Sequence, residues 1–203
     1  MARLRSPRGC PWDREQDHLT LRYHAVEEVY ELMDAIEAED DQEMLEELGD
    51  LLLQVVFHCQ LAMERGAFDF EQVARRITDK LIRRHPHVFG DVTAKTVDQV
   101  WANWEKIKHA EKHGTRHARP SALDGIPKHL PALLRAEKLV KKARQAKLIP
   151  GGQSSRRRLT KGSLAKELFA LADLAQNHGW SAEELLRREI QQQERALRKR
   201  EAK

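Results

Sequence analysis

The chain has 203 residues, of which 40% are hydrophobic and 33% charged, and its formal net charge is +4 at pH 7. This length accommodates one or two domains with a buried core. No apolar run approaches the ~20 residues of a membrane span, and the N-terminus lacks the apolar core of a signal peptide. Two cysteines are too few for a disulfide framework. The charged, aromatic-poor composition is typical of all-α proteins, and we expect a cytoplasmic location.

The chain begins with irregular structure and continues with two helices. Residues 1–16 contain Pro7, Gly9 and Pro11, which break helices. The apolar periodicity then predicts helices over residues 19–39 and 42–65, and Gly66 ends the second.

Capping residues predict the start of two further helices. Asp69 with Gln72 is a capping box that begins a third helix, and Pro86 stops it. Thr96 with Gln99 is a similar pair before a fourth helix. We therefore expect four helices in the first 112 residues.

Apolar stripes on these helices predict that they pack in a core. The second helix is apolar on nearly every face from Leu51 to Phe57, as core helices are. The third and fourth helices are too few to cover this surface, so we expect a homodimer. The stripes comprise Val26, Val29, Met33 and Ile36 on the first helix, Leu45, Leu48, Leu52, Val55 and Cys59 on the second, and Phe70, Val73, Ile77 and Leu81 on the third.

Two carboxylate clusters accompany the first two stripes. The first comprises Glu27, Glu28 and Glu31, and the second comprises Glu46, Glu47 and Asp50. Spacings of three and four residues place such side chains on one helix face. An acidic helix face is usually just solvated. A short loop, however, makes these helices antiparallel neighbours, so the clusters can converge.

Converging carboxylates need a cation. Four of them cannot all stay ionised close together without one, and an oxygen-only ligand set suits Mg²⁺ or Mn²⁺ better than zinc. We therefore predict a metal site between the first two helices.

The third helix carries a basic face with Lys80, Arg83 and Arg84. Basic helix faces are mostly solvated, but a metal–polyphosphate site requires cations that neutralise the remaining phosphate charge. On the fourth helix, Lys108 lies one turn after Trp104. Two roles are possible for Trp104: packing in the core, which we favour, and stacking on a substrate base. Two are also possible for Lys108: binding phosphate and lying free on the surface.

Five segments in this order resemble the MazG nucleoside triphosphate pyrophosphohydrolases. They are GCPWDREQ, EEVYEL, EELGDLLLQVVFH, DKLIRRHPHVFGD and WANWEKIK. The match covers residues 9 to about 112 densely, and a weaker match extends to about residue 143. The resemblance implies an all-α, four-helix-type fold that dimerises. It also implies Mg²⁺-dependent cleavage of nucleoside triphosphates between the α- and β-phosphates, which yields a nucleoside monophosphate and pyrophosphate.

The resemblance also assigns residues. The ExxE and ExxD metal motifs of the family fall on Glu28 with Glu31 and on Glu47 with Asp50. Its phosphate-binding residues fall on Lys80, on Arg83 or Arg84, and on Lys108. Glu27 or Glu46 would orient the attacking water or act as general base, and the sequence does not choose between them.

The second half of the chain carries a faint internal repeat of the first. Residues 48–60 align with residues 164–176, and residues 69–84 align with residues 181–196. In this register Glu47 corresponds to Ser163 and Asp50 to Lys166. Longer members of the family carry two copies of the domain, and the second can be the active one. Here we expect an intact domain over residues 1–112, a linker over residues 113–131 and a degenerate, inactive helical repeat over residues 132–203.

Two other classes of protein share parts of this pattern. A non-catalytic nucleic-acid-binding module is suggested by a pI near 9.1, by Arg156 to Arg158 and by the basic tail from Arg187. Few aromatics accompany that tail and no helix-turn-helix signature is evident, so we expect no nucleic-acid partner. A di-iron carboxylate bundle needs Glu-x-x-His motifs, and neither acidic motif has a histidine at that place. Only His24, one turn before Glu28, could supply a histidine ligand instead.

Overall fold

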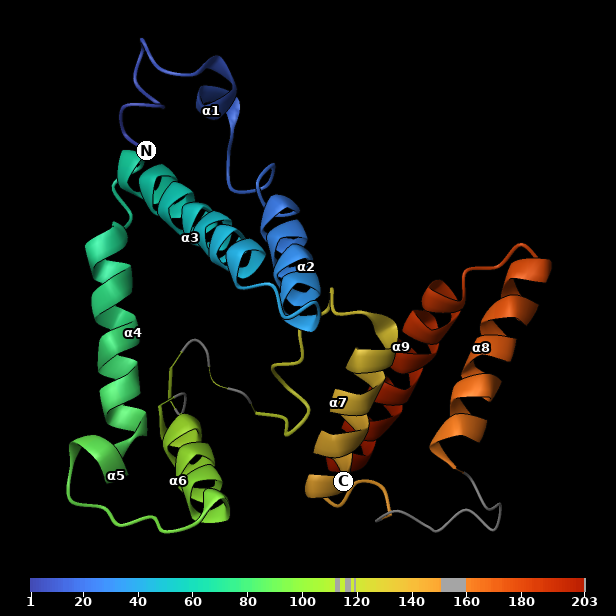
Figure 1. Ribbon diagram of the computed structural model, residues 1–203. Helices are drawn as coiled ribbons and strands as arrows, with labels where there is room; N and C mark the ends of the chain where they lie inside the picture. The colour runs from blue at the N-terminus through green and yellow to red at the C-terminus, as the bar shows by residue number, and fades with distance from the viewer. Residues whose placement is uncertain (112–113, 116–117, 119, 151–159, 203) are drawn as a thin grey trace. The chain divides into compact units, whose positions relative to one another are not determined.

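The computed structural model describes residues 1–111, 114–115, 118, 120–150 and 160–202, and these contain nine α-helices and no strand (Figure 1). The all-α prediction is therefore confirmed. The chain forms two compact units, residues 1–108 and residues 109–203. The helices are α1 (Pro11–Glu15), α2 (His24–Glu37), α3 (Asp41–Glu64), α4 (Phe70–Arg84), α5 (Pro86–Phe89), α6 (Val97–Ala110), α7 (Ala132–Gln145), α8 (Lys161–Asn177) and α9 (Ala182–Glu201). No helix in the described part is both long and apolar enough to cross a membrane.

The first 23 residues differ from the sequence-based expectation at two points. Residues 11–15 form the short helix α1, because Pro11 stands at a first helical position, where its missing N–H costs nothing. The next helix begins at His24 rather than near Leu19. The carboxylate of Asp17 accepts hydrogen bonds from the backbone N–H groups of Leu19 and Thr20, and these bonds stabilise a turn in place of the expected helical start.

The boundaries of α3 and α4 follow from their caps. Asp40 accepts hydrogen bonds from the backbone N–H groups of Gln42 and Glu43 and so begins α3. Asp69 and Gln72 form the predicted capping box of α4. Between the two helices, Gly66 has a φ of +68°, a left-handed conformation that glycine adopts without the strain of a Cβ.

The α6 cap is shifted by one residue from the predicted box. Thr96 Oγ1 accepts from the backbone N–H of Gln99, as expected. The Gln99 side chain, however, accepts from the backbone N–H of Lys95 instead of that of Thr96.

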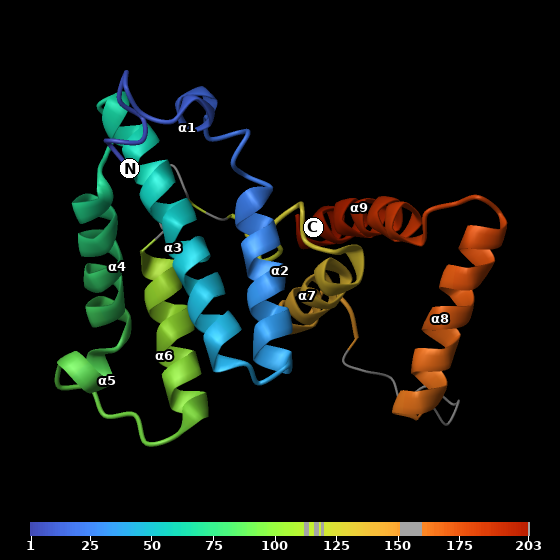
Figure 2. The ribbon, with the colours of Figure 1, turned by 45° about the horizontal axis from the view of Figure 1, so that its top comes forward.

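Helices α2 and α3 pack side by side as an antiparallel pair (Figures 1 and 2). Leu21, Phe57 and Leu61 form the buried core of this unit, and the side chain of Met1 packs against it. In Figure 1, α6 lies apart from both α2 and α3. This unit thus supplies one tightly packed helix pair rather than a closed four-helix bundle.

Most of the predicted apolar stripes are exposed within the single chain, in keeping with the expectation that the other helices of the domain are too few to cover them. Leu52 and Val55 in the middle of α3 are 54% and 38% exposed. The reason is geometric: a helix that is apolar all round needs neighbours all round, and α2 covers only one side of α3. The exposed stripe residues are Val26, Val29, Met33, Ile36, Leu45, Leu48, Leu52, Val55, Phe70, Ile77 and Leu81, whereas Cys59 is buried.

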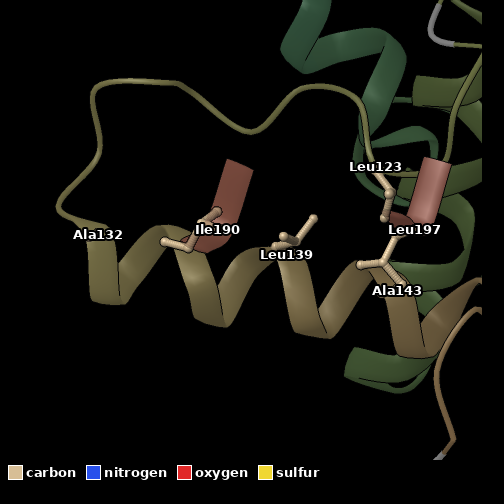
Figure 3. Packing of buried hydrophobic residues seen from close by; sticks show 6 residues of the cluster. All are labelled: Leu123, Ala132, Leu139, Ala143, Ile190 and Leu197. Atoms are coloured by element: carbon tan, nitrogen blue, oxygen red, sulfur yellow. The ribbon is translucent and has the colours of Figure 1, made fainter. Parts of the chain in front are cut away.

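The second unit is built on α7 and α9, which pack against each other. Its core comprises Leu123, Ala132, Leu139, Ala143, Ile190 and Leu197 (Figure 3). Arg135, which is buried, pairs with Glu194 at 2.7 Å across the two helices. Leu123 is 1% exposed, so part of the predicted linker belongs to this core.

The turn between α8 and α9 repeats the turn between α3 and α4. Gly179 has a φ of +69°, close to the value of Gly66. In each turn the residue after the glycine donates its backbone N–H to an alanine carbonyl of the preceding helix, Ala67 to Ala62 and Trp180 to Ala175. Both alanines are buried. The two hairpins therefore share a turn geometry, although both glycines lie between the aligned segments.

Candidate metal centre

Three carboxylates of α2 and α3 come together in one cluster. Glu28, Glu47 and Asp50 each offer one oxygen atom, and these atoms lie within 4.8 Å of one another. Glu47 and Asp50 are three residues apart on α3, so they share a face. Because α2 and α3 are antiparallel, the first half of α2, where Glu28 lies, faces the part of α3 that carries Glu47 and Asp50. The convergence of the two acidic motifs is thus seen for three of the four predicted ligands.

The fourth predicted ligand, Glu31, lies beside this cluster on an exposed part of α2. Loss of hydration raises the pKa of Glu31 above its ordinary value, and the negative charges of Glu27, Glu28 and Asp50 raise it further. The negative charges of Glu28 and Asp50 therefore act on the carboxylate of Glu31. Together with Asp34, Asp40, Glu43 and Glu47 it lines an acidic hollow of about 390 Å³ between α2 and α3.

Glu47 is the strongest indication that the cluster suits a cation. Its Oε2 atom is buried and has no hydrogen-bond partner among the described residues. Loss of hydration raises the pKa of Glu47, and the charges of Glu31, Asp50 and Glu28 raise it further. A buried carboxylate oxygen without a donor is costly unless a positive charge faces it. The donor set consists of oxygen atoms alone, which fits Mg²⁺ or Mn²⁺.

The two candidate general bases stand outside this group of three. Glu27 is exposed, and its Oε2 lies 3.6 Å from Nδ1 of His24. Glu46 is exposed on α3. The di-iron hypothesis would require His24 to join the carboxylates as a ligand. In the described residues, the group of potential metal ligands contains carboxylates and no histidine, and His24 pairs with Glu27 instead.

The predicted phosphate-binding residues lie on α4 and α6. Lys80 and Arg83 are exposed on α4, and Arg84 is half-buried. Lys108 pairs with Glu105 on its own helix, with Nζ and Oε1 3.1 Å apart. Trp104 is half-buried, and its ring centroid lies 5.5 Å from that of Trp101 and 5.7 Å from that of His85. Aromatic packing thus accounts for Trp104 within the chain. Arg156 to Arg158 lie outside the described residues.

One polar residue at the centre was missed by the sequence analysis. Gln54 is buried on α3 and donates a hydrogen bond from Nε2 to Oε1 of Glu28, at 3.1 Å. The signal was present in the sequence, since Gln54 interrupts the apolar run from Leu51 to Phe57 and stands one turn after Asp50.

The second missed feature is a group of rings at the end of the α2–α3 pair. Trp12 makes edge-to-face contacts with His24 and with Phe57. His18 and His58 stack on each other, with their Nδ1 atoms 2.8 Å apart. Burial lowers the pKa of His58, and the neighbouring His18 lowers it further. Only the folded chain brings these rings together.

Fold and site together define an all-helical protein with a candidate carboxylate metal centre on two paired helices. Residues 16–89 match the MazG nucleotide pyrophosphohydrolase domain. The chain is 52% identical over 143 residues to the nucleoside triphosphate pyrophosphohydrolase of Escherichia coli strain K12, covering 70% of this chain and 54% of the relative. It is 48% identical over 145 residues to the nucleoside triphosphate pyrophosphohydrolase/pyrophosphatase MazG of Thermotoga maritima, covering 71% and 54%.

A third relative, the nucleoside triphosphate pyrophosphohydrolase of Mycolicibacterium smegmatis, is 38% identical over 151 residues, covering 71% of this chain and 46% of the relative. The chain belongs to the MazG family, as its motifs predict. It spans about half the length of these curated relatives.

Proposed function

We propose that the first unit of this chain hydrolyses nucleoside triphosphates, ribo- or deoxyribo-, to a nucleoside monophosphate and pyrophosphate. The observation that carries the proposal is the cluster of Glu28, Glu47 and Asp50 on a MazG domain. Three close carboxylates with a buried, unpartnered oxygen need a cation, and the relatives are named for this reaction. We place the active domain at residues 1–112.

Glu28, Glu47 and Asp50 would hold the metal ion, and Glu31 is the remaining ligand or the residue that orients a ligand water. Mg²⁺, or Mn²⁺ in its place, supplies charge neutralisation at the phosphates and makes a bound water more acidic. The carboxylates themselves fix where the ion sits, because α2 and α3 hold them from two sides. The acidic hollow beside them would repel a free nucleotide, so the substrate binds as its metal complex.

The remaining roles fall to residues around this centre. Lys80 with Arg83 or Arg84, and Lys108, would neutralise the phosphate charge that the ion leaves. Glu27 or Glu46 would orient the attacking water or take its proton. Trp104, stacked within the chain on Trp101, serves substrate binding only if its outer face contacts a base.

A homodimer would complete the four-helix-type bundle. The support is the exposed apolar surface of α2 and α3, which includes Leu48, Leu52 and Leu53. A surface of this kind marks an interface. Closing the bundle with a second copy would bury the stripes beside the carboxylates and exclude water from the centre.

We further propose that residues 132–203 are a degenerate copy of the MazG domain, joined by the linker at residues 113–131. The matching turns at Gly66 and Gly179 support this relation between the α3–α4 and α8–α9 hairpins. In the copy, Ser163 and Lys166 stand where Glu47 and Asp50 stand in the first unit. This half would therefore bind no catalytic metal.

The test is a panel of ribo- and deoxyribonucleoside triphosphates with Mg²⁺ and the full chain, scored for pyrophosphate against orthophosphate. We expect pyrophosphate and a nucleoside monophosphate, with the rate abolished by chelation. Glu47→Gln should be inactive, whereas Glu37→Gln, the same charge change at the exposed end of α2, should be active. Orthophosphate as the primary product, or a rate that survives exhaustive chelation, contradicts the proposal.

A further inference from the structure

Gln54 is a buried polar side chain in an otherwise apolar stretch of α3. It is 7% exposed, and it lies one turn after Asp50. Its neighbours in sequence from Leu51 to Phe57 are all apolar. An apolar residue at this place would be buried without a polar penalty, so the amide calls for an explanation beyond packing.

The amide makes one hydrogen bond, and that bond fixes its orientation. Nε2 donates to Oε1 of Glu28 at 3.1 Å. Rotating the amide by half a turn would set its oxygen against the carboxylate oxygen, two acceptors without a proton between them. In the observed orientation Oε1 of Gln54 is buried without a hydrogen-bond partner among the described residues. The protein thus keeps an amide whose carbonyl is unsatisfied, at a cost to folding stability.

The benefit lies in Glu28. Its carboxylate stands within 4.8 Å of those of Glu47 and Asp50, so like charges push it away from the cluster whenever no cation is bound. A hydrogen bond from Gln54 opposes that movement. The amide also carries no net charge, so it holds Glu28 without competing with a cation as a lysine would.

We propose that Gln54 is a positioning residue that preorganises Glu28 for the metal ion. The inference rests on the proposed metal centre. It adds Gln54, a residue of α3, which orients Glu28, a ligand on α2. Residues that hydrogen-bond to metal ligands raise affinity by keeping the ligand in place before the ion arrives. Gln54 acts on metal affinity through Glu28 and does not touch the substrate.

The chain offers a matched control. Gln60 stands on the same helix and also donates from Nε2 to a glutamate, Oε1 of Glu64, at 3.0 Å. That pair lies on the surface, outside the carboxylate cluster. Gln54→Met and Gln60→Met therefore remove the same kind of hydrogen bond from α3, one at the centre and one away from it.

The experiment measures Mn²⁺ binding to the full chain by the electron paramagnetic resonance of free Mn²⁺, together with the melting temperature of the metal-free protein. Gln54→Met should weaken Mn²⁺ binding by about 10–100-fold. Its metal-free melting temperature should hold or rise, because an unsatisfied buried carbonyl is removed at nearly constant volume. Gln60→Met should bind Mn²⁺ as the wild type does. A purely structural role for Gln54 would give the opposite pattern, a lower melting temperature with unchanged affinity.

Turnover supplies a second readout. With Mg²⁺ raised to saturation, the rate of Gln54→Met should approach that of the wild type, since the lesion is in metal affinity. Gln54→Leu serves as a second variant if Gln54→Met folds poorly by circular dichroism. If wild-type protein binds Mn²⁺ and both Gln54 variants bind it equally well, or if Gln60→Met is weakened to the same degree, the inference fails and the proposed function stands. If the wild type binds no Mn²⁺, the metal centre fails and the role of Gln54 fails with it.

Discussion

Replacing Asp50 with asparagine should separate metal binding from folding stability. The change keeps the shape of the side chain and removes one negative charge from the cluster. Two unit charges 4.8 Å apart, the limit for the oxygens of Asp50 and Glu28, repel by about 0.9 kcal/mol in water and about 3.5 kcal/mol at an effective dielectric of about 20. Asp50 is half-buried, so we take about 1 kcal/mol as the relief. That corresponds to about 4 °C in the melting temperature of a unit of this size.

The effect on the metal-bound protein should have the opposite sign. Losing a ligand should weaken Mn²⁺ binding by more than the ~10–100-fold typical of residues that merely orient ligands. At a Mn²⁺ concentration 100 times the wild-type dissociation constant, binding stabilises the wild type by about 2.7 kcal/mol, and a 100-fold weaker variant by about 0.4 kcal/mol. Melting curves with and without Mn²⁺, with pyrophosphate release measured alongside, give both quantities.

Lys166→Ala is the control in the other half of the chain. Lys166 is exposed on α8 and is the repeat counterpart of Asp50. The variant should leave Mn²⁺ binding and turnover unchanged, because no carboxylate cluster surrounds that position in the described residues. Normal turnover in Asp50→Asn, or an inactive Lys166→Ala, would show that the site has been placed in the wrong half.

Two further predictions concern assembly and pH. Sedimentation at micromolar concentration should show a homodimer, and Leu52→Glu should shift it toward monomer, because Leu52 is exposed in the single chain; a stable and active wild-type monomer would refute this. Arg5 donates to both carboxylate oxygens of Glu64 at 2.8 Å, and this lowers the pKa of Glu64 below its ordinary 4.5. The pair therefore stabilises the fold above pH 4.5, and the stabilisation disappears as pH falls through the lowered pKa. The difference in melting temperature between wild type and Glu64→Gln should shrink on acidification, and a constant difference would contradict the assignment.

Local structure could be predicted where short-range hydrogen bonds determine it. The capping box of Asp69 and Gln72 marks the start of α4, and Gly66 marks the end of α3, since both features involve residues three or four apart. The same reasoning failed near Leu19, where the Asp17 side chain stabilises a turn. There a competing local hydrogen bond outweighed the apolar periodicity that predicts a helix.

The sequence by itself determined that acidic residues share helix faces, because a spacing of three or four residues is a property of every α-helix. It also determined the family, through motifs in a specific order. Which carboxylates meet was decided only by the rotation of α2 against α3, which brings Glu28, Glu47 and Asp50 together and leaves Glu27 outside the group. The burial of Gln54 against Glu28 and the exposure of the α3 stripe likewise depend on which side of each helix finds a neighbour. The contacts of Glu28 with Glu47, Asp50 and Gln54 join residues 19 to 26 positions apart, and helical periodicity carries no information about them.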